Sequence, residues 1–160
     1  MQTEGVILAG GFVQHPMQWG VRLAEKFVGG ISPSLLTRII FGYAKTARFR
    51  FRRSPETLAS IDEFVARRTD LDRQAATWRL RLVGQSDARE TARQIETPVF
   101  ALTGVLDPIV PWPFVFPWLH RHCPALRNSR IVWQADHNVL GTAPQLSAEQ
   151  VLRWMQTVSK

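Results

Sequence analysis

Asp107 and His137 are the two side chains in this sequence whose types and spacing predict chemistry. Each follows a short apolar run, at residues 99–102 and 130–134, that is typical of a buried strand. A carboxylate that accepts a hydrogen bond from one imidazole nitrogen fixes the tautomer of the ring and leaves the other nitrogen as a general base. If they meet in the folded chain, the two side chains would form the proton-transferring part of a site that activates a nucleophile.

The segment between the two runs decides whether these side chains meet. Residues 114–121 have room for a crossover helix, and two strands joined in this way are expected to be parallel neighbours with a right-handed connection. Parallel neighbours have their C-terminal ends at the same edge of the sheet, where ligands gather in open α/β sheets. Asp136 is the rival partner for His137. Adjacent residues at the end of a strand point to opposite faces, so we expect Asp107 to be the partner.

The motifs GVLDPIVPW and ADHNVL, followed by a C-terminal helix that Ser147 can cap, resemble the C-terminal part of the α/β-hydrolase fold, and the opening stretch VILAGGF extends the resemblance. The acid of that family falls on Asp107 and its histidine on His137, in the family's order. The resemblance implies an α/β fold class, a partial α/β-hydrolase fold. It would have about three parallel strands, near residues 5–10, 98–103 and 130–135, with flanking helices and an inserted helical cap. The implied reaction is hydrolysis of a small-molecule ester or related acyl substrate by a Ser-His-Asp mechanism, without a metal or organic cofactor.

The nucleophile of that mechanism is missing from the sequence. It sits in a G-x-S-x-G turn upstream of the acid in the family, and none of the eight serines here has that pattern. We therefore expect a C-terminal piece of a hydrolase that is inactive alone. A frameshifted product and a complete non-catalytic protein remain as alternatives.

The middle of the chain, residues 17–93, has a helical period and divides the chain into three parts. Residues 1–16 would supply a core strand and loop, and residues 94–160 the rest of the core. In the resembled family, helices inserted at this place form a cap over the active site; the alternative is that they pack on the sheet. An apolar face is predicted for each of four helices in this segment, formed by Trp19, Leu23 and Phe27; by Leu35, Leu36, Ile39, Ile40 and Tyr43; by Leu58, Ile61, Phe64 and Val65; and by Leu71, Ala75, Trp78 and Leu82.

Three residues are assigned to substrate binding: His15, Trp19 and Trp112. His15 follows the opening strand and would lie near the same sheet edge as Asp107 and His137. The alternative for His15, which precedes a proline in a turn, is a purely structural loop residue.

Composition limits the class of protein. The chain is 45% hydrophobic and 21% charged, which is typical of globular domains, and no apolar run of about 18 residues predicts a membrane span. The N-terminus lacks a basic leader. The single cysteine, Cys123, cannot form an internal disulfide. Together these features favour a reducing, cytoplasmic setting.

The net charge of +7 is unevenly spread, with six basic and no acidic residues between Arg38 and Arg53. This segment raises a second function, a non-catalytic binding module that uses a basic helical face. Nucleic acid is the less favoured partner. Self-association is expected through the first strand, where Val6, Ile7 and Leu8 would form an open, apolar sheet edge.

Overall fold

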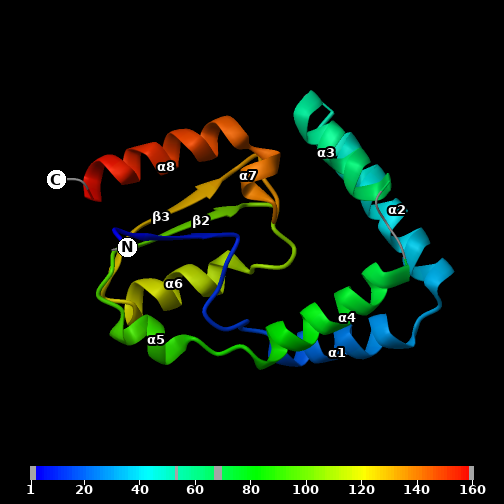
Figure 1. The fold of residues 1–160 in the computed structure, drawn as a ribbon, viewed down its shortest axis with the longest axis horizontal. Coiled ribbons are helices and arrows are strands. Elements are labelled where there is room, and N and C mark those ends of the chain that lie inside the picture. The colour runs from blue at the N-terminus through cyan, green and yellow to red at the C-terminus, as the bar shows by residue number, and fades with distance from the viewer. Residues whose placement is uncertain (1–2, 53, 67–69, 159–160) are drawn as a thin grey trace. The chain divides into compact units, whose positions relative to one another are not determined.

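The computed structural model describes residues 3–52, 54–66 and 70–158, and within helices and strands it leaves some further side chains undescribed, Leu71 among them; Arg53 lies outside these ranges. The chain forms two compact units (Figure 1). Met1–Pro16 and Asp87–Lys160 form one, here called the sheet unit, and Met17–Ser86 forms the other, here called the helical unit. Residues 87–93 fall in the sheet unit. There the Ala88 amide donates a hydrogen bond of 2.8 Å to the Val13 carbonyl, and the Gln14 side chain donates one of 3.0 Å to Asp87 Oδ2.

The described part of the sheet unit holds three parallel strands, as the sequence predicts. They are β1 (Val6–Ala9), β2 (Val99–Gly104) and β3 (Leu126–Val132), in the order β1-β2-β3. All six residues of the central strand β2 are buried. Alternate β2 residues face opposite layers of the core, because successive side chains on a strand point to opposite faces.

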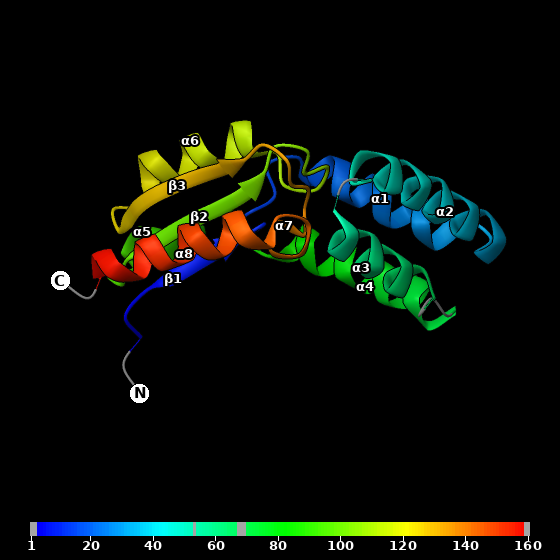
Figure 2. The ribbon, with the colours of Figure 1, turned by 90° about the horizontal axis from the view of Figure 1, so that it is seen from above.

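Helices cover both faces of this sheet (Figure 2). Val99 and Ala101 share a cluster with α6 (Trp112–His122), whereas Phe100 and Leu102 share another with Trp154 of α8 (Pro144–Val158). The rings of Phe100 and Trp154 stack with centroids 5.1 Å apart. The short helices α5 (Arg89–Gln94) and α7 (Val139–Thr142) lead into β2 and α8 respectively. Cys123 is buried where α6 ends.

Two predicted positions in this unit are wrong. The third strand spans 126–132 rather than 130–135, so it begins with the polar stretch LRNS, and the exposed Trp133 lies beyond its end. β3 is only partly buried, so backbone pairing with β2 fixes its limits more than an apolar run does; a register irregularity leaves Arg127 out of the pairing. The last helix begins at Pro144, and Ser147 does not cap it. The buried Ser147 hydroxyl donates instead to the carbonyl of Val139, at 2.9 Å.

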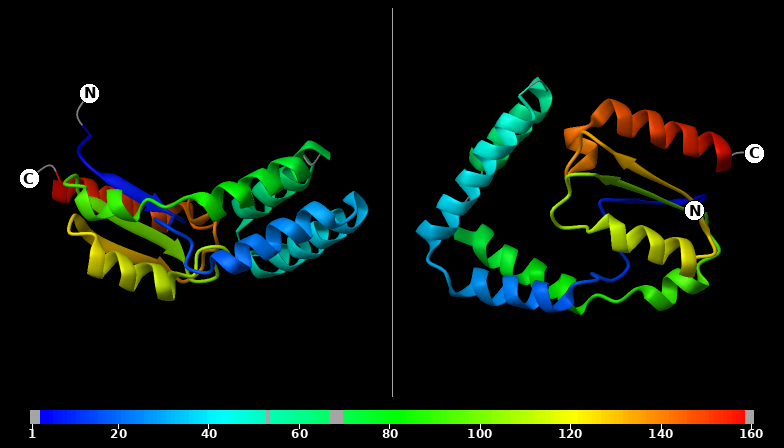
Figure 3. Two further views of the ribbon diagram at one scale, coloured as in Figure 1. Left: turned by 90° about the horizontal axis from the view of Figure 1, so that it is seen from below. Right: turned by 180° about the vertical axis from the view of Figure 1, so that it is seen from behind.

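The helical unit contains α1 (Gln18–Gly30), α2 (Pro33–Arg50), α3 (Pro55–Ala66) and α4 (Asp70–Gln85). α1 packs along α4, and α2 packs mainly on α3 (Figure 3). Ser32 caps α2 by accepting a hydrogen bond from the backbone of Leu35 at 3.3 Å, and Pro33 occupies the first helical position. Among the described helices, none is long and apolar enough to cross a bilayer.

The apolar stripe predicted to be buried on α1 is exposed: Trp19 is 71% exposed, Leu23 61% and Phe27 55%. α1 meets α4 through a different face, where Val21 is buried and Glu25 of α1 pairs with Arg81 of α4 at 2.8 Å. The predicted buried face of α2 is also wrong in part, because Leu35, Ile39 and Tyr43 are exposed. On α4, Trp78 and Leu82 are likewise exposed, and Leu71 lies outside the described side chains.

Candidate active site

The turn after β2 holds Asp107 in one orientation. Its Oδ1 accepts backbone hydrogen bonds of 2.8 Å from both Ile109 and Val110, an arrangement that Pro108 favours by bending the chain between them. Its Oδ2 is left to face the loop after β3, and Thr103 donates to it at 3.4 Å. The side chain of Asp107 has no exposed surface. The carboxylate is therefore positioned before any contact with His137 is considered.

His137 meets this carboxylate. Its Nδ1 donates to Asp107 Oδ2 at 3.1 Å, and the side chain is 42% exposed. Nδ1 is the donor because a carboxylate can only accept. In that tautomer Nε2 is unprotonated, and no hydrogen bond to Nε2 is seen from the described residues. The contact expected from the two strand ends is present, and the ring presents a basic nitrogen beside it.

Two glycines let the His137 loop approach the sheet. Gly10, just past β1, has a φ of +61°, and a Cβ there would lie 2.6 Å from the carbonyl oxygen of His137. Gly104 ends β2, and a Cβ there would overlap the backbone of Ala135 and Asp136. At position 10, the positive φ and the lack of room for a Cβ together require glycine. The loop is thus set against the ends of β1 and β2 as well as following β3.

Asp136, the rival partner, is engaged elsewhere. The buried Asp136 accepts hydrogen bonds from the backbone of Asn138 at 3.0 Å and from the Thr142 hydroxyl at 3.2 Å, both through Oδ1. Thr142 Oγ1 also lies 3.2 Å from the Asp136 amide and 2.9 Å from the Asn138 carbonyl oxygen. These bonds close the turn that carries His137.

The surroundings of the pair favour its charged form. Burial by itself would raise the pKa of Asp107, but hydrogen bonds from His137 and from the backbone of Val110 and Ile109 outweigh it and hold the pKa below its ordinary value. The hydrogen bond to Asp107 raises the pKa of His137 above its ordinary value. Partial burial of the ring opposes that shift, and the charges of Asp107 and Asp136 add to it. An imidazolium at this position is thus stabilised.

Comparisons with known proteins were made for the sequence and for the fold. No protein-family profile and no curated protein match the sequence. Solved structures do match the fold. They include a hydrolase from Pseudomonas aeruginosa (14% identity, TM-score 0.70), a thermophilic esterase from Thermogutta terrifontis (17%, 0.68) and MenH from S. aureus (14%, 0.67). The matches cover 94%, 98% and 98% of this chain but 55%, 57% and 60% of those proteins.

The chain has part of an α/β-hydrolase fold. The fold class predicted from the sequence is therefore confirmed, and the chain spans a little over half the length of the solved structures that it matches. At these identities the likeness concerns the fold. The roles of individual residues remain predictions.

The structure places the three residues assigned to substrate binding differently. His15 is buried and its Nε2 donates to the carbonyl of Ile109 at 3.0 Å, so it contacts the loop that carries Asp107. The ring of Phe12 packs against it edge-on, with centroids 5.2 Å apart. Trp112 begins α6 on the same segment and packs partly buried against the core. Trp19 belongs to the helical unit.

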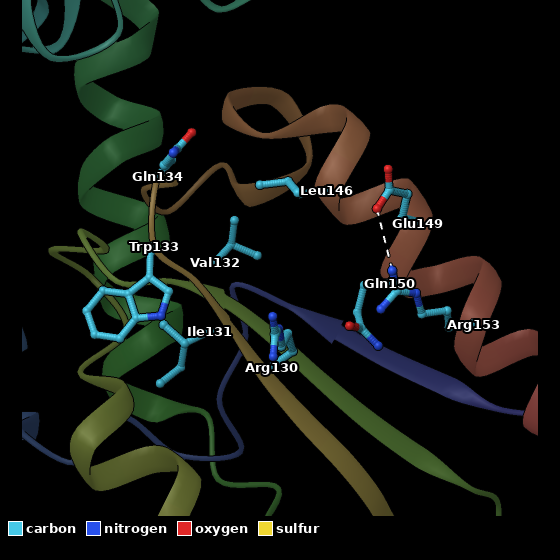
Figure 4. Close-up of a pocket in the computed structure, with 9 residues that line it drawn as sticks. All are labelled: Arg130, Ile131, Val132, Trp133, Gln134, Leu146, Glu149, Gln150 and Arg153. Atoms are coloured by element: carbon cyan, nitrogen blue, oxygen red, sulfur yellow. Dashed lines mark ion pairs between the residues drawn. The ribbon is translucent and has the colours of Figure 1, made fainter.

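Two cavities in the sheet unit lie away from the pair. One of about 170 Å³ opens between the end of β3 and α8 (Figure 4), where the Val132 and Leu146 side chains lie in the space between the two elements. Arg153 pairs with Glu149 at 3.7 Å beside it. Another, of about 100 Å³, lies between residues 13–16 and α6. Neither is lined by Asp107 or His137, and within the described residues no group of three His, Cys, Asp or Glu could hold a metal ion.

Proposed function

We propose that this chain supplies the acid and the histidine of a serine-type α/β-hydrolase that acts on small-molecule esters or related acyl substrates. The observation that carries the proposal is the 3.1 Å hydrogen bond that His137 Nδ1 donates to Asp107 Oδ2. The carboxylate has no exposed surface, whereas the ring is 42% exposed. The nucleophile would come from a segment outside these 160 residues, because no G-x-S-x-G occurs in them.

In the proposed reaction His137 moves the proton. Nε2 takes the proton from a serine hydroxyl as its oxygen attacks the ester carbonyl, and Asp107 stabilises the imidazolium that forms. The imidazolium then protonates the departing alkoxide, and an acyl-enzyme results. A water molecule, deprotonated by the same nitrogen, releases the acid and restores the serine. The raised pKa of His137 and the lowered pKa of Asp107 support this assignment, since both favour the charged pair.

We further propose that the helical unit acts as the cap that selects the substrate, with His15, Trp19 and Trp112 contributing contacts, and that the protein acts in the cytoplasm. These assignments follow from the resemblance and from the helical period of residues 17–93. The names of the similar structures, a hydrolase and an esterase, are in keeping with acyl chemistry.

The 160-residue chain alone should show no turnover of an activated ester such as p-nitrophenyl acetate above the buffer rate, because a base without its serine has no nucleophile to activate. A longer product, encoded together with any upstream G-x-S-x-G segment, should hydrolyse the same ester. In that product His137→Ala should lower kcat by about 10⁴- to 10⁶-fold and Asp107→Ala by about 10⁴-fold.

Hydrolysis by the 160-residue chain that survives both His137→Ala and Asp107→Ala would remove the catalytic assignment of these residues. In the longer product, Glu90→Gln is the matched control, since Glu90 is an exposed carboxylate of the same unit that pairs with Arg93. It should leave kcat unchanged.

A further inference from the structure

The whole charge surplus of the protein lies in the helical unit. Residues 17–86 contain thirteen Lys and Arg against six Asp and Glu, whereas the remaining residues contain seven of each kind. The formal charge of +7 is therefore that of the helical unit, and the sheet unit is neutral overall. Such an asymmetry directs this unit toward an anionic partner.

The contacts between α1 and α4 determine which face of α1 is left outside. Gly84 of α4 lies against Val21, Arg81 donates to Glu25 at 2.8 Å, and Thr77 lies against Gly29. The three α1 positions in these contacts are four residues apart and form one face of the helix. The salt bridge and the burial of Val21 hold α1 in this rotation.

The opposite face of α1 is apolar and exposed. Trp19, Leu23 and Phe27 are also four residues apart, half a helical turn away from the contact face, and more than half of each is exposed. Arg22 and Lys26 precede Leu23 and Phe27 by one position, so they flank the apolar stripe on one side, and both are exposed. A helix with Trp, Phe and Leu beside Arg and Lys is the pattern of a helix that lies in a membrane interface.

A groove lies on the side of the stripe that Arg22 and Lys26 occupy. It has a volume of about 550 Å³, lies between α1 and α4, and brings Arg22, Lys26 and Arg81 together. Its carboxylate, Glu25, already accepts from Arg81, whose guanidinium also lies 4.5 Å over the ring of Trp78. Guanidinium and ammonium groups gathered beside an apolar stripe suit phosphate oxygens that sit above an acyl layer.

We propose that the outer face of α1, with the α1–α4 groove, docks on an anionic phospholipid surface. Leu23 and Phe27 enter the boundary between headgroups and acyl chains, and Arg22 and Lys26 contact lipid phosphates. A nucleic acid offers no apolar layer in which to bury Leu23 and Phe27. A second copy of the chain would bring two units of the same positive charge together. The proposal does not depend on the catalytic pair.

The test is flotation of the full chain with vesicles of phosphatidylcholine alone or mixed with phosphatidylserine. Binding should be strong only to the mixed vesicles, should fall as salt rises, and should survive millimolar inorganic phosphate. Arg22→Gln/Lys26→Gln should weaken it by at least about tenfold, since each cation near such a surface contributes roughly fivefold. Leu23→Ala/Phe27→Ala should weaken it comparably.

The matched control is Arg130→Gln/Arg153→Gln, which removes the same charge from the sheet unit and should bind as the wild type does. Circular dichroism checks that every variant keeps its helices. Equal loss in the two arginine-containing pairs would show that only net charge acts, and would overturn the proposal. Equal binding to neutral vesicles, binding to a DNA or RNA oligonucleotide instead of vesicles, displacement by inorganic phosphate, or self-association without vesicle binding would each overturn it as well.

Discussion

The imidazole of His137 has two nitrogen atoms with different surroundings. Nδ1 donates to a buried carboxylate, and the exposed part of the ring is left for chemistry. The lone pair of Nε2 is the only feature of the described pair that could take a proton at neutral pH. The behaviour of this ring therefore reports directly on whether Asp107 plays its assigned part.

In Asp107→Asn the pKa of His137 should fall from its raised value, because the anion that stabilises the imidazolium is lost. NMR titration of the ring protons of His137 measures this, with Glu90→Gln as the control that should not move it. The direction of each pKa shift also determines how the pair's contribution to folding stability depends on pH. The His137 contribution is complete below the unfolded pKa of about 6.5 and is lost as pH rises through the folded value. The Asp107 contribution is present above about 3.8 and is lost as pH falls through its folded value. An unchanged His137 titration in Asp107→Asn would show that the two side chains do not interact.

Much of this pair could be predicted from the sequence, since an acid and a histidine each follow an apolar run and parallel strands share an edge. Its supports could not. Gly10 and Gly104 read only as strand ends, and their close approach to residues 135–137 arises from tertiary packing. Thr103, which donates to Asp107, is hidden in an apolar run. Asp136 carries no sequence signal that separates a rival partner from a residue that braces the turn.

Gly10→Ala should destabilise the sheet unit by about 1–3 kcal/mol, because an alanine at a φ of +61° is strained and its Cβ would meet the His137 carbonyl. Chemical denaturation followed by circular dichroism measures the change. Gly42→Ala in α2 is the control, since a Cβ there meets nothing within 4 Å and should stabilise the helix by up to about 1 kcal/mol. A neutral Gly10→Ala would mean that the loop is free to move away.

At the scale of elements, the helices and strands were predicted more readily than their limits and rotations. The apolar run at β2 identifies a central strand because both of its faces are covered. The predicted limits of β3 are wrong because Asn128 and Ser129 pair with β2 although their side chains are polar, so no apolar run marks them as part of the strand. On α1, a salt bridge to α4 and the burial of Val21 lie on a different face from the one that its apolar period favours.

The layer between the sheet and α8 should depend on Trp154, which is 4% exposed and stacks on Phe100. Trp154→Ala should cost about 3–5 kcal/mol, because it removes the largest side chain of that layer and leaves a cavity. Trp133→Ala removes the same side chain where it is 73% exposed, and should change stability by less than about 0.5 kcal/mol. Thermal unfolding of the two variants side by side makes the comparison. Equal losses would contradict the packing described for α8.

At the scale of the whole molecule, the acid–histidine pair and the surplus positive charge lie in different units. The sheet unit carries the paired acid and histidine and no net charge, while the helical unit carries the charge and most of the large exposed apolar side chains. Chemistry and attachment are thereby proposed for separate parts of one chain.

The 160-residue chain should self-associate through β1. Within the described residues, the outer edge of β1 pairs with no strand, and Ile7 on it is 37% exposed. Light scattering should show growth of oligomers at about 10–100 μM, the range in which exposed edges associate. Ile7→Lys should suppress it, because a charge on an edge strand opposes pairing, and Ile109→Lys, at a similarly exposed loop position, should not. A chain that stays monomeric over this range would show that the edge is not adhesive.

The position of the His137 loop against Gly10 also has a consequence for the order of events in folding. Gly10 and His137 are in contact although they lie 127 residues apart in the sequence. Gly10 also donates a 2.8 Å hydrogen bond to the Leu102 carbonyl of β2. Contacts between such distant residues form late, since the loop between them must close first. The histidine can reach its working position only after β1 and β2 have aligned. In a refolding experiment its native ring signal should be among the last to appear, so the proposed chemistry would switch on only in molecules whose sheet has finished assembling.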